Sequence, residues 1–303
     1  MHKKSMQVIK IRGGHTAPKR CVISLGVGKE VYKKCLDRLA ESLVRTGFAG
    51  DLLTWSDHYP EGCPEFLDAP FAFKTYCFFA AKELGYEEIL WMDPPCVALR
   101  PLDGIYQQMQ KNGYILFNNN YGQMMGQWCG DATLSANHIT REQALQIPEI
   151  PCSVLGLDMR SERAVAFLQA WSSIMRDGVS AKGTSRTIED WEDYQAVFWN
   201  TGARISTDPR VKGHRCDQPA AGIVAHRLGM QPYGDELRDF HYKAKPIKRN
   251  TVILHHREFG TSIKSLDQIY HEVFFRIPFV ETPLSKLRNL KRRLKSLSST
   301  LEQ

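Results

Sequence analysis

Short apolar segments alternate with amphipathic ones from residue 21 to residue 178, and this alternation limits the folds that the chain can adopt. Apolar runs fit strands at 21–28, 50–57, 87–93, 114–119 and 152–159. Segments with an apolar face fit helices at 29–47, 69–85, 102–113, 141–148 and 161–178. Strands that alternate with helices predict an α/β fold, a Rossmann-type sandwich whose mostly parallel central sheet has helices on both faces.

The composition fits a soluble globular protein. The 303 residues are 43% hydrophobic and 24% charged, which suits one large α/β domain or two small ones. Every apolar stretch is shorter than the roughly 18–20 residues of a membrane-spanning helix, and the basic residues 1–20 lack the apolar core of a secretory signal. We therefore expect a cytoplasmic protein whose eight cysteines, none in a CxxC pair, are reduced core residues.

Much of the net charge of +7 lies towards the two ends of the chain. A middle close to neutral does not fit a broad nucleic-acid footprint, so we expect no nucleic-acid partner. Near the C-terminus, leucines recur every three or four residues with lysines and arginines between them. The chain is thus divided into an N-terminal extension (1–20), one domain (21–280) and a basic amphipathic C-terminal helix (281–303).

Two locations are open for that helix. In the first, residues 283–303 lie on an anionic membrane surface, which would make the protein peripheral on the inner face of a membrane. In the second, the helix docks on the domain or on another subunit.

The stretch "ILWMDPPC" holds the first candidate site residue. A buried strand ends on Asp93, and Pro94 and Pro95 are expected to hold the chain extended beyond it. The first predicted strand ends in a glycine turn at Gly26 and Gly28, which we expect at the same edge of the sheet as Asp93. Because ligands bind parallel α/β sheets at the carboxyl ends of the strands, Asp93 is either a site residue or a turn or helix cap.

Lysine and histidine supply further candidates. Lys74 lies among aromatic residues near the start of a helix, where it either meets a phosphate or is a solvated lysine. His255 and His256 end a strand of β-branched and apolar residues. Two histidines at a strand end are either metal or phosphate partners or structural residues.

The densest polar cluster opens the helix that is predicted after residue 216. His214, Arg215, Asp217 and Gln218 crowd its start. Capping alone would need one such residue rather than four, so the cluster favours a functional role.

Together these stretches resemble the GT-A superfamily of nucleotide-sugar glycosyltransferases, including its glycogenin-like members and a bacterial or viral group of polysaccharide sugar transferases. The order of the segments carries the resemblance: "FAFK", "EILWMDPPCVALRPLD", "CSVLGLDM", "HRCDQPAAG" and "ILHH". It covers roughly residues 20–260. It implies a GT-A-like sandwich that transfers a hexosyl or pentosyl group from a nucleoside diphosphate to a hydroxyl of a glycan or lipid-linked acceptor.

One departure from the family concerns its aspartate-x-aspartate motif, which binds a divalent cation that bridges the donor diphosphate. Here two prolines follow Asp93, so the second carboxylate is missing. Either Mn²⁺ or Mg²⁺ is held by Asp93 with His255 or His256, or cationic residues led by Lys74 and Arg215 neutralise the diphosphate without a metal.

The resemblance also distributes roles among the candidates. The residues assigned to the nucleotide are Leu25, Gly26, Val27, Gly28 and Asp57. The residues assigned to the diphosphate are Lys74, Asp93, His214, Arg215, His255 and His256. The residues assigned to the sugar are Asp217 and Gln218, with Asp217 as the base if the reaction inverts.

Two functions of other classes remain open. A non-catalytic module could bind a sugar nucleotide at a degenerate "DPPC" site, although the "HRCDQ" and "ILHH" clusters then lack a purpose. A sugar-phosphate nucleotidyltransferase would carry a glycine-rich, basic signature after its first strand, which "GVGKEVYKK" fits poorly.

Overall fold

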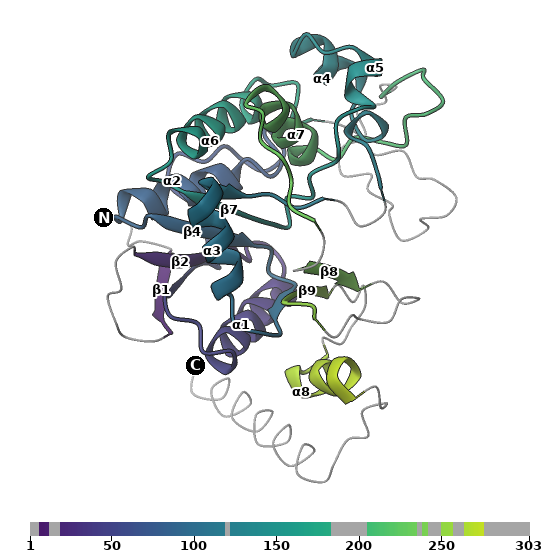
Figure 1. The fold of residues 1–303 in the computed structure, drawn as a ribbon. Helices are drawn as coiled ribbons and strands as arrows, with labels where there is room; N and C mark the ends of the chain where they lie inside the picture. Colours follow the sequence, from purple (N-terminus) through teal and green to yellow (C-terminus); the bar gives the residue numbers. More distant parts are fainter. Residues whose placement is uncertain are drawn as a thin grey trace. The chain divides into compact units, whose positions relative to one another are not determined.

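The alternation of strands and helices is present in the fold. The computed structural model describes residues 6–11, 19–118, 122–182, 205–234, 238–241, 250–256 and 264–275. The chain divides into two units, Met1–Ile263 and Lys264–Gln303 (Figure 1). In the first unit a central sheet is covered by helices, which confirms the α/β class.

Six strands of the described residues form the main sheet, in the order β1-β3-β2-β4-β7-β6. They are β1 Met6–Lys10, β2 Arg20–Leu25, β3 Asp51–Trp55, β4 Glu88–Met92, β6 Tyr114–Ile115 and β7 Val154–Asp158. β3, β2 and β4 pair in parallel, while β1 is antiparallel to β3, and β7 is antiparallel to β4 and β6. β2, β3, β4 and β6 therefore run one way and β1 and β7 the other, so the expected mostly parallel sheet is confirmed.

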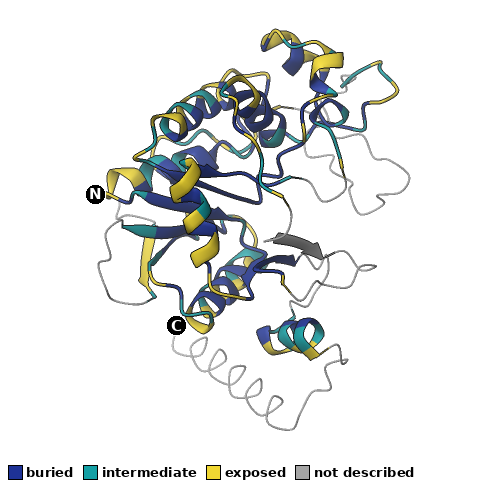
Figure 2. Ribbon diagram, in the orientation of Figure 1, coloured by how far each residue is buried: buried dark blue, intermediate teal, exposed yellow. Residues whose placement is uncertain are grey.

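Helices cover both faces of this sheet. The helices described in the first unit are α1 Glu30–Arg45, α2 Phe73–Glu83, α3 Asp103–Asn112, the 3-10 turn η1 Met125–Gln127, α4 Asp131–Ala136, α5 Arg141–Ala144, α6 Glu162–Met175 and α7 Asp217–Arg227. Figure 1 shows α2, α6 and α7 on one side of the sheet and α1 on the other. Apart from the exposed edge strand β1, the strands between them are almost wholly buried (Figure 2).

Strand alternation assigns each side chain of β4 to one of two cores, because successive residues of a strand face opposite sides. Ile89 and Trp91 pack into the core that contains α2, α6 and α7. Leu90 and Met92 pack into the core that contains α1 and α3. A side chain two residues beyond Trp91 is therefore directed to the α2 face.

A second, smaller sheet in the order β5-β9-β8 adjoins the end of β4. It consists of β5 Cys96–Ala98, β8 Arg238–His241 and β9 Ile253–His256. β9 pairs antiparallel with β5 in a register that sets His255 opposite Cys96. The predicted strand with the two histidines thus belongs to this sheet and not to the main one.

The two prolines after Asp93 form a turn, and the expectation of an extended chain is wrong. The Cys96 N–H donates to the Asp93 carbonyl over 2.8 Å, with Pro94 and Pro95 between them. A proline in the second position of a turn pre-sets its φ, so it favours chain reversal as readily as extension. The turn leads directly into β5 and so brings β9 beside Asp93.

Described residues lie near both predicted domain boundaries, and the division into extension, domain and helix stays a prediction. Residues 6–10, within the predicted extension, form the edge strand β1. The second unit begins at Lys264, ahead of the predicted boundary at 280, and contains α8 Leu266–Tyr270 and the π-helical turn η3 His271–Phe275. The predicted amphipathic helix over 281–303 lies outside the described residues.

No helix in the described parts of the chain is long and apolar enough to cross a membrane.

The amino-terminal edge of the parallel strands is held by a buried carboxylate. Glu88, fully buried at the start of β4, accepts from Arg20 over 2.6 Å, from Gln110 over 2.7 Å and from Arg160 over 2.8 Å. Each partner comes from a different part of the fold. These hydrogen bonds satisfy the carboxylate and tie β2, β4 and α3 together, which is a structural arrangement.

Candidate functional site

Asp93 lies at the opposite edge, where β4 ends. Its carboxylate is on the same face as the side chain of Trp91, because the two residues are two positions apart on a strand. The Trp91 indole N–H donates to Asp93 Oδ1 over 2.8 Å. The Asp93 side chain is 21% exposed and therefore accessible from solvent.

Lys74 joins Asp93 to two other segments. It is the second residue of α2 and is buried. Its ammonium Nζ lies 3.3 Å from Asp93 Oδ1 and 2.7 Å from Asp217 Oδ2, and it donates to the Cys152 carbonyl over 2.8 Å. Asp217 is the first residue of α7 and is also buried. The "FAFK", "WMD" and "CDQ" stretches thus meet at one ammonium group.

The histidines of β9 lie beside this cluster. His255 Nε2 is 3.8 Å from Asp93 Oδ2. His256 is buried, and its backbone N–H donates to the Pro95 carbonyl over 3.1 Å. From α1, the buried guanidinium of Arg38 donates to the carbonyls of Pro95 and His256 over 3.1 and 3.3 Å. Arg38 therefore fixes the turn after Asp93 to the strand that carries the histidines.

The pKa values of Asp93 and Asp217 are shifted in opposite directions, although both carboxylates contact Lys74. Burial raises the pKa of Asp93, but Lys74, His255 and the Trp91 indole outweigh it and lower the pKa to about 2. Burial raises the pKa of Asp217, and Lys74 offsets only part of the rise. Burial lowers the pKa of Lys74, but Asp217 and Asp93 more than compensate and raise it. Asp93 therefore stays ionised, whereas Asp217 has the greater affinity for a proton.

Part of this cluster fits a divalent cation. Within the described ranges, no group of three or more His, Cys, Asp or Glu side chains is arranged around a possible metal position. Asp93 Oδ2 and His255 Nε2 are nevertheless an oxygen and a nitrogen donor 3.8 Å apart at the exposed side of the cluster. Two such donors suit an ion that takes its remaining ligands from substrate phosphates and water.

His214 and Arg215 make their contacts elsewhere. His214 Nδ1 accepts from the Gly130 N–H over 3.0 Å, and Nε2 lies 2.9 Å from the Ser180 carbonyl. Burial lowers the pKa of His214 to about 4, so the ring is neutral. Arg215 lies 2.6 Å from Glu149 and stacks 3.5 Å above the Trp128 ring. The charge of Arg215 is thus already balanced, and neither residue is a ready cation for a diphosphate.

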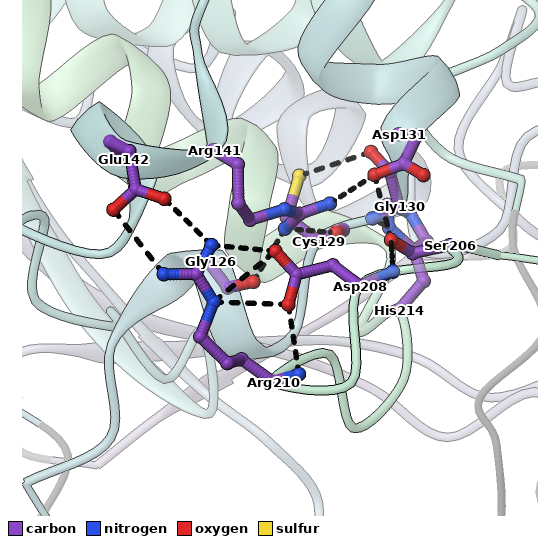
Figure 3. Close-up of polar contacts among 10 residues, drawn as sticks. All are labelled: Gly126, Cys129, Gly130, Asp131, Arg141, Glu142, Ser206, Asp208, Arg210 and His214. Atoms are coloured by element: carbon purple, nitrogen blue, oxygen red, sulfur yellow. Dashed lines mark hydrogen bonds and ion pairs between the residues drawn. The ribbon is translucent and has the colours of Figure 1, made fainter.

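A polar network anchors the segment that leads to α7 (Figure 3). Arg141 on α5 donates to the carbonyl of Cys129 over 2.7 Å and pairs with Asp131. Ser206 donates to Asp131 over 2.9 Å, and Arg210 pairs with Glu142 over 2.7 Å. The network fastens residues 205–214 to α4 and α5, which sets the path along which the chain reaches Asp217.

The predicted nucleotide loop lies at the carboxyl edge but contacts α1. The Gly26 N–H donates to the Trp55 carbonyl over 2.8 Å. A Cβ atom at Gly26 would lie 2.7 Å from Leu36 Cδ1 and 3.1 Å from the Tyr32 carbonyl oxygen, so this loop packs closely against α1. The exposed Asp57 pairs with Lys33 of α1 over 3.1 Å. The assignments of Leu25, Gly26, Val27, Gly28 and Asp57 to the nucleotide stay predictions.

Gln218 lies beside Asp217 at the start of α7. Its side-chain Oε1 is buried, and within the described part of the chain it accepts no hydrogen bond. A buried amide oxygen without a donor is uncommon in folded proteins and costs free energy.

Three groups of this site were not predicted from the sequence. The Trp91 indole and the Cys152 carbonyl bind the charged cluster directly, and Arg38 braces it from behind. Trp91 could have been found from its place two residues before Asp93. Arg38 falls with Cys35 and Leu39 on the buried face of α1, so an arginine on an apolar stripe was the available signal.

Comparisons with known proteins give distant likenesses. No family model and no curated protein matches the sequence. A glycosyltransferase involved in the glycosylation of the major capsid of PBCV-1 is 16% identical, with 81% of this chain and 95% of that chain covered and a TM-score of 0.43. The bifunctional glycosyltransferase WbbM is 6% identical, with 82% of this chain and 47% of that chain covered and a TM-score of 0.45. The glycosyltransferase GlyE of Streptococcus pneumoniae is 11% identical, with 84% of this chain and 60% of that chain covered and a TM-score of 0.43. At these scores the likeness does not decide the function.

Proposed function

We propose that this chain is a glycosyltransferase of the GT-A type, which moves a sugar from a nucleoside diphosphate to a hydroxyl of a glycan or lipid-linked acceptor. The observation that carries the proposal is the Lys74–Asp93–Asp217 cluster at the carboxyl edge of the parallel strands. Ligands of open α/β sheets bind at that edge. Two carboxylates and one ammonium, with His255 beside them, can bind sugar hydroxyls and orient a charged donor.

Asp217 and Gln218 are the groups proposed to face the sugar. The raised pKa of Asp217 makes its carboxylate a better proton acceptor than Asp93, as a general base for an attacking hydroxyl needs. The free acceptor on Gln218 Oε1 suits a donor hydroxyl of the sugar. Whether the configuration at the transferred carbon is inverted or retained decides if Asp217 takes the proton or only orients the substrate.

The charges favour a divalent cation at the diphosphate. Lys74 is shared between two aspartates, Arg215 is paired with Glu149, and His214 is neutral. The cations that a metal-free reaction would use are therefore already engaged. Asp93 and His255 would hold Mn²⁺ or Mg²⁺, and a bound ion would offset negative charge on the leaving diphosphate.

A panel of UDP-, GDP-, dTDP- and CMP-sugars, with and without Mn²⁺, tests the activity. Donor hydrolysis together with a thermal shift supports the transferase. Binding without turnover across a range of glycan acceptors would instead favour a non-catalytic module. Release of pyrophosphate from a sugar phosphate and a nucleoside triphosphate would identify a nucleotidyltransferase.

Asp217→Asn tests the residue assignment. We expect turnover to fall by about 10²- to 10⁴-fold, with donor affinity largely kept because Asp93 and His255 remain. Unchanged turnover in this variant would remove Asp217 from the mechanism.

For the metal, Asp93→Asn and His255→Asn should each raise the Mn²⁺ concentration needed for half-maximal turnover. Equal wild-type rates in Mn²⁺ and in EDTA would contradict the metal proposal.

A peripheral membrane location is proposed from the tail alone. The leucines and basic residues of 283–303 support binding to an anionic surface, where a lipid-linked acceptor would be found. Flotation of the full chain and of a chain lacking 283–303 with anionic liposomes tests this. Equal binding of both forms would rule it out.

A further inference from the structure

The residue before Asp217 has a backbone conformation that suits glycine. Cys216 has φ +52° and ψ −96°, and the Gln218 N–H donates to the Arg215 carbonyl over 3.2 Å. These are the features of a type II′ turn with Cys216 in its first central position. Glycine ordinarily occupies that position, since a Cβ atom makes positive φ unfavourable.

The chain before the turn is fixed by Arg215. Its guanidinium lies 2.6 and 2.7 Å from the two oxygens of Glu149 and donates to Gln123 over 2.8 Å. It stacks on the Trp128 ring, and the Arg215 backbone N–H donates to the Trp128 carbonyl over 3.1 Å. An arginine that is both ion-paired, here through Nη1, and stacked on an aromatic ring defines the orientation of its own backbone more closely than a single hydrogen bond does.

The chain after the turn is fixed by Asp217. Its carbonyl accepts from the Trp171 indole over 3.2 Å, and its carboxylate lies 2.7 Å from Lys74. Both of these partners belong to helices on the same face of the sheet. Cys216 is therefore placed between two anchored residues, and their positions impose the turn.

We propose that the Arg215–Glu149 pair positions Asp217, by holding Cys216 in a strained type II′ turn that aims the Asp217 carboxylate at Lys74. The effect on catalysis rests on the proposed function, but the strain and its mechanical link do not. Without the pair, Cys216 relaxes to negative φ and the Asp217 carboxylate moves from Lys74.

Comparing alanine with glycine at position 216 measures the strain. Both replacements remove the thiol, and Cys216→Ala keeps the Cβ atom. At an ordinary site glycine is the less stable of the two. Here we expect Cys216→Gly to have a folding equilibrium constant about fivefold or more above that of Cys216→Ala, because relief of positive φ outweighs glycine's entropy. Cys35, equally buried within α1, is the matched control, at which alanine should be the more stable.

A double-mutant cycle measures the link to Asp217. If Glu149 acts through the turn, Glu149→Gln already weakens the Asp217–Lys74 contact. The double variant Glu149→Gln with Asp217→Asn should then lose about fivefold less of its folding equilibrium constant than the product of the two single losses. In a Cys216→Gly background the effects of Glu149→Gln and Asp217→Asn on the folding equilibrium constant should multiply, because glycine adopts the turn without help from the Arg215–Glu149 pair. Glu88→Gln with Asp217→Asn is the control cycle and should be multiplicative, since Glu88 lies at the other edge of the sheet.

Activity supplies the third measurement. Glu149→Gln should lower kcat for donor turnover by about tenfold or more with little change in KM, and Cys216→Gly should restore most of it. Three results would each overturn the proposal. They are a Cys216→Gly protein less stable than Cys216→Ala, multiplicative effects of Glu149→Gln and Asp217→Asn on the folding equilibrium constant, and no recovery of kcat when Cys216→Gly is added to Glu149→Gln. If the wild-type protein turns over no nucleotide sugar, the proposed function fails, while the two stability measurements still decide the turn.

Discussion

Asp93 and Asp217 show how two carboxylates on one lysine acquire different properties. Asp93 has the Trp91 indole and His255 as further partners, and its pKa falls to about 2. Asp217 is buried, and its pKa rises despite its contact with Lys74. Environments that push the pKa values of neighbouring acids apart are typical of sites that need one ionised group and one proton carrier.

The lowered pKa of Asp93 predicts an acid-sensitive contribution to stability. The fall from 3.8 to about 2 corresponds to about 2 kcal/mol, present above pH 4 and lost as the pH falls towards 2. Asp217 contributes with the opposite sign, because its pKa is raised. Urea unfolding at pH 5 and pH 2.5 should show wild type losing about 2 kcal/mol more than Asp93→Asn. The exposed Asp37→Asn should follow wild type, and parallel losses in all three proteins would contradict the assignment.

The elements of the fold were more predictable than their arrangement. The alternation of apolar and amphipathic segments indicated β2, α1, β3, α2, β4, α3, β7 and α6 within a few residues, since periodicity is a local property. β1 was not expected, because Met6–Lys10 is a short edge strand whose residues are mostly exposed. The turn at Pro94–Pro95 and the second sheet were missed, because their formation depends on pairing with β9, more than 150 residues away.

At the level of elements, His214 should make the attachment of the 205–216 segment sensitive to pH. Burial lowers its pKa from 6.5 to about 4, so the unfolded chain takes up the proton first as the pH falls. The folded state then loses about 3 kcal/mol between pH 6.5 and pH 4. Comparing unfolding free energies at pH 7.5 and 4.5, we expect His214→Gln to lose about 2 kcal/mol less than wild type. The exposed His58→Gln is the control and should behave as wild type; an unchanged pH profile in His214→Gln would contradict the prediction.

Over the whole molecule, the two edges of the sheet hold different kinds of charge. At the amino edge, Glu88 has three donors around it and is fully buried. At the carboxyl edge, Asp93 is partly exposed and Gln218 Oε1 accepts no bond within the described residues. The sequence indicated which residues are chemically notable at the carboxyl edge. It did not separate Lys74, which joins the cluster, from Arg215, which does not, because both have the same charge and only the packed fold decides their partners.

This difference predicts that stability and activity separate between the two edges. Glu88→Gln removes the carboxylate shared by Arg20 and Arg160, whose side chains are 19% and 44% exposed, which costs about 1–3 kcal/mol and lowers Tm by about 2–12 °C. Below the Tm of the variant, its donor turnover should stay within about threefold of wild type, because the carboxyl edge is intact. Asp217→Asn should show the reverse, with turnover lost and a smaller change in Tm, since Asp93 continues to balance Lys74. Thermal unfolding and turnover, measured on the same two proteins, decide the matter: if Glu88→Gln were folded but inactive, the amino edge would belong to the site, and the separation of roles between the edges would be wrong.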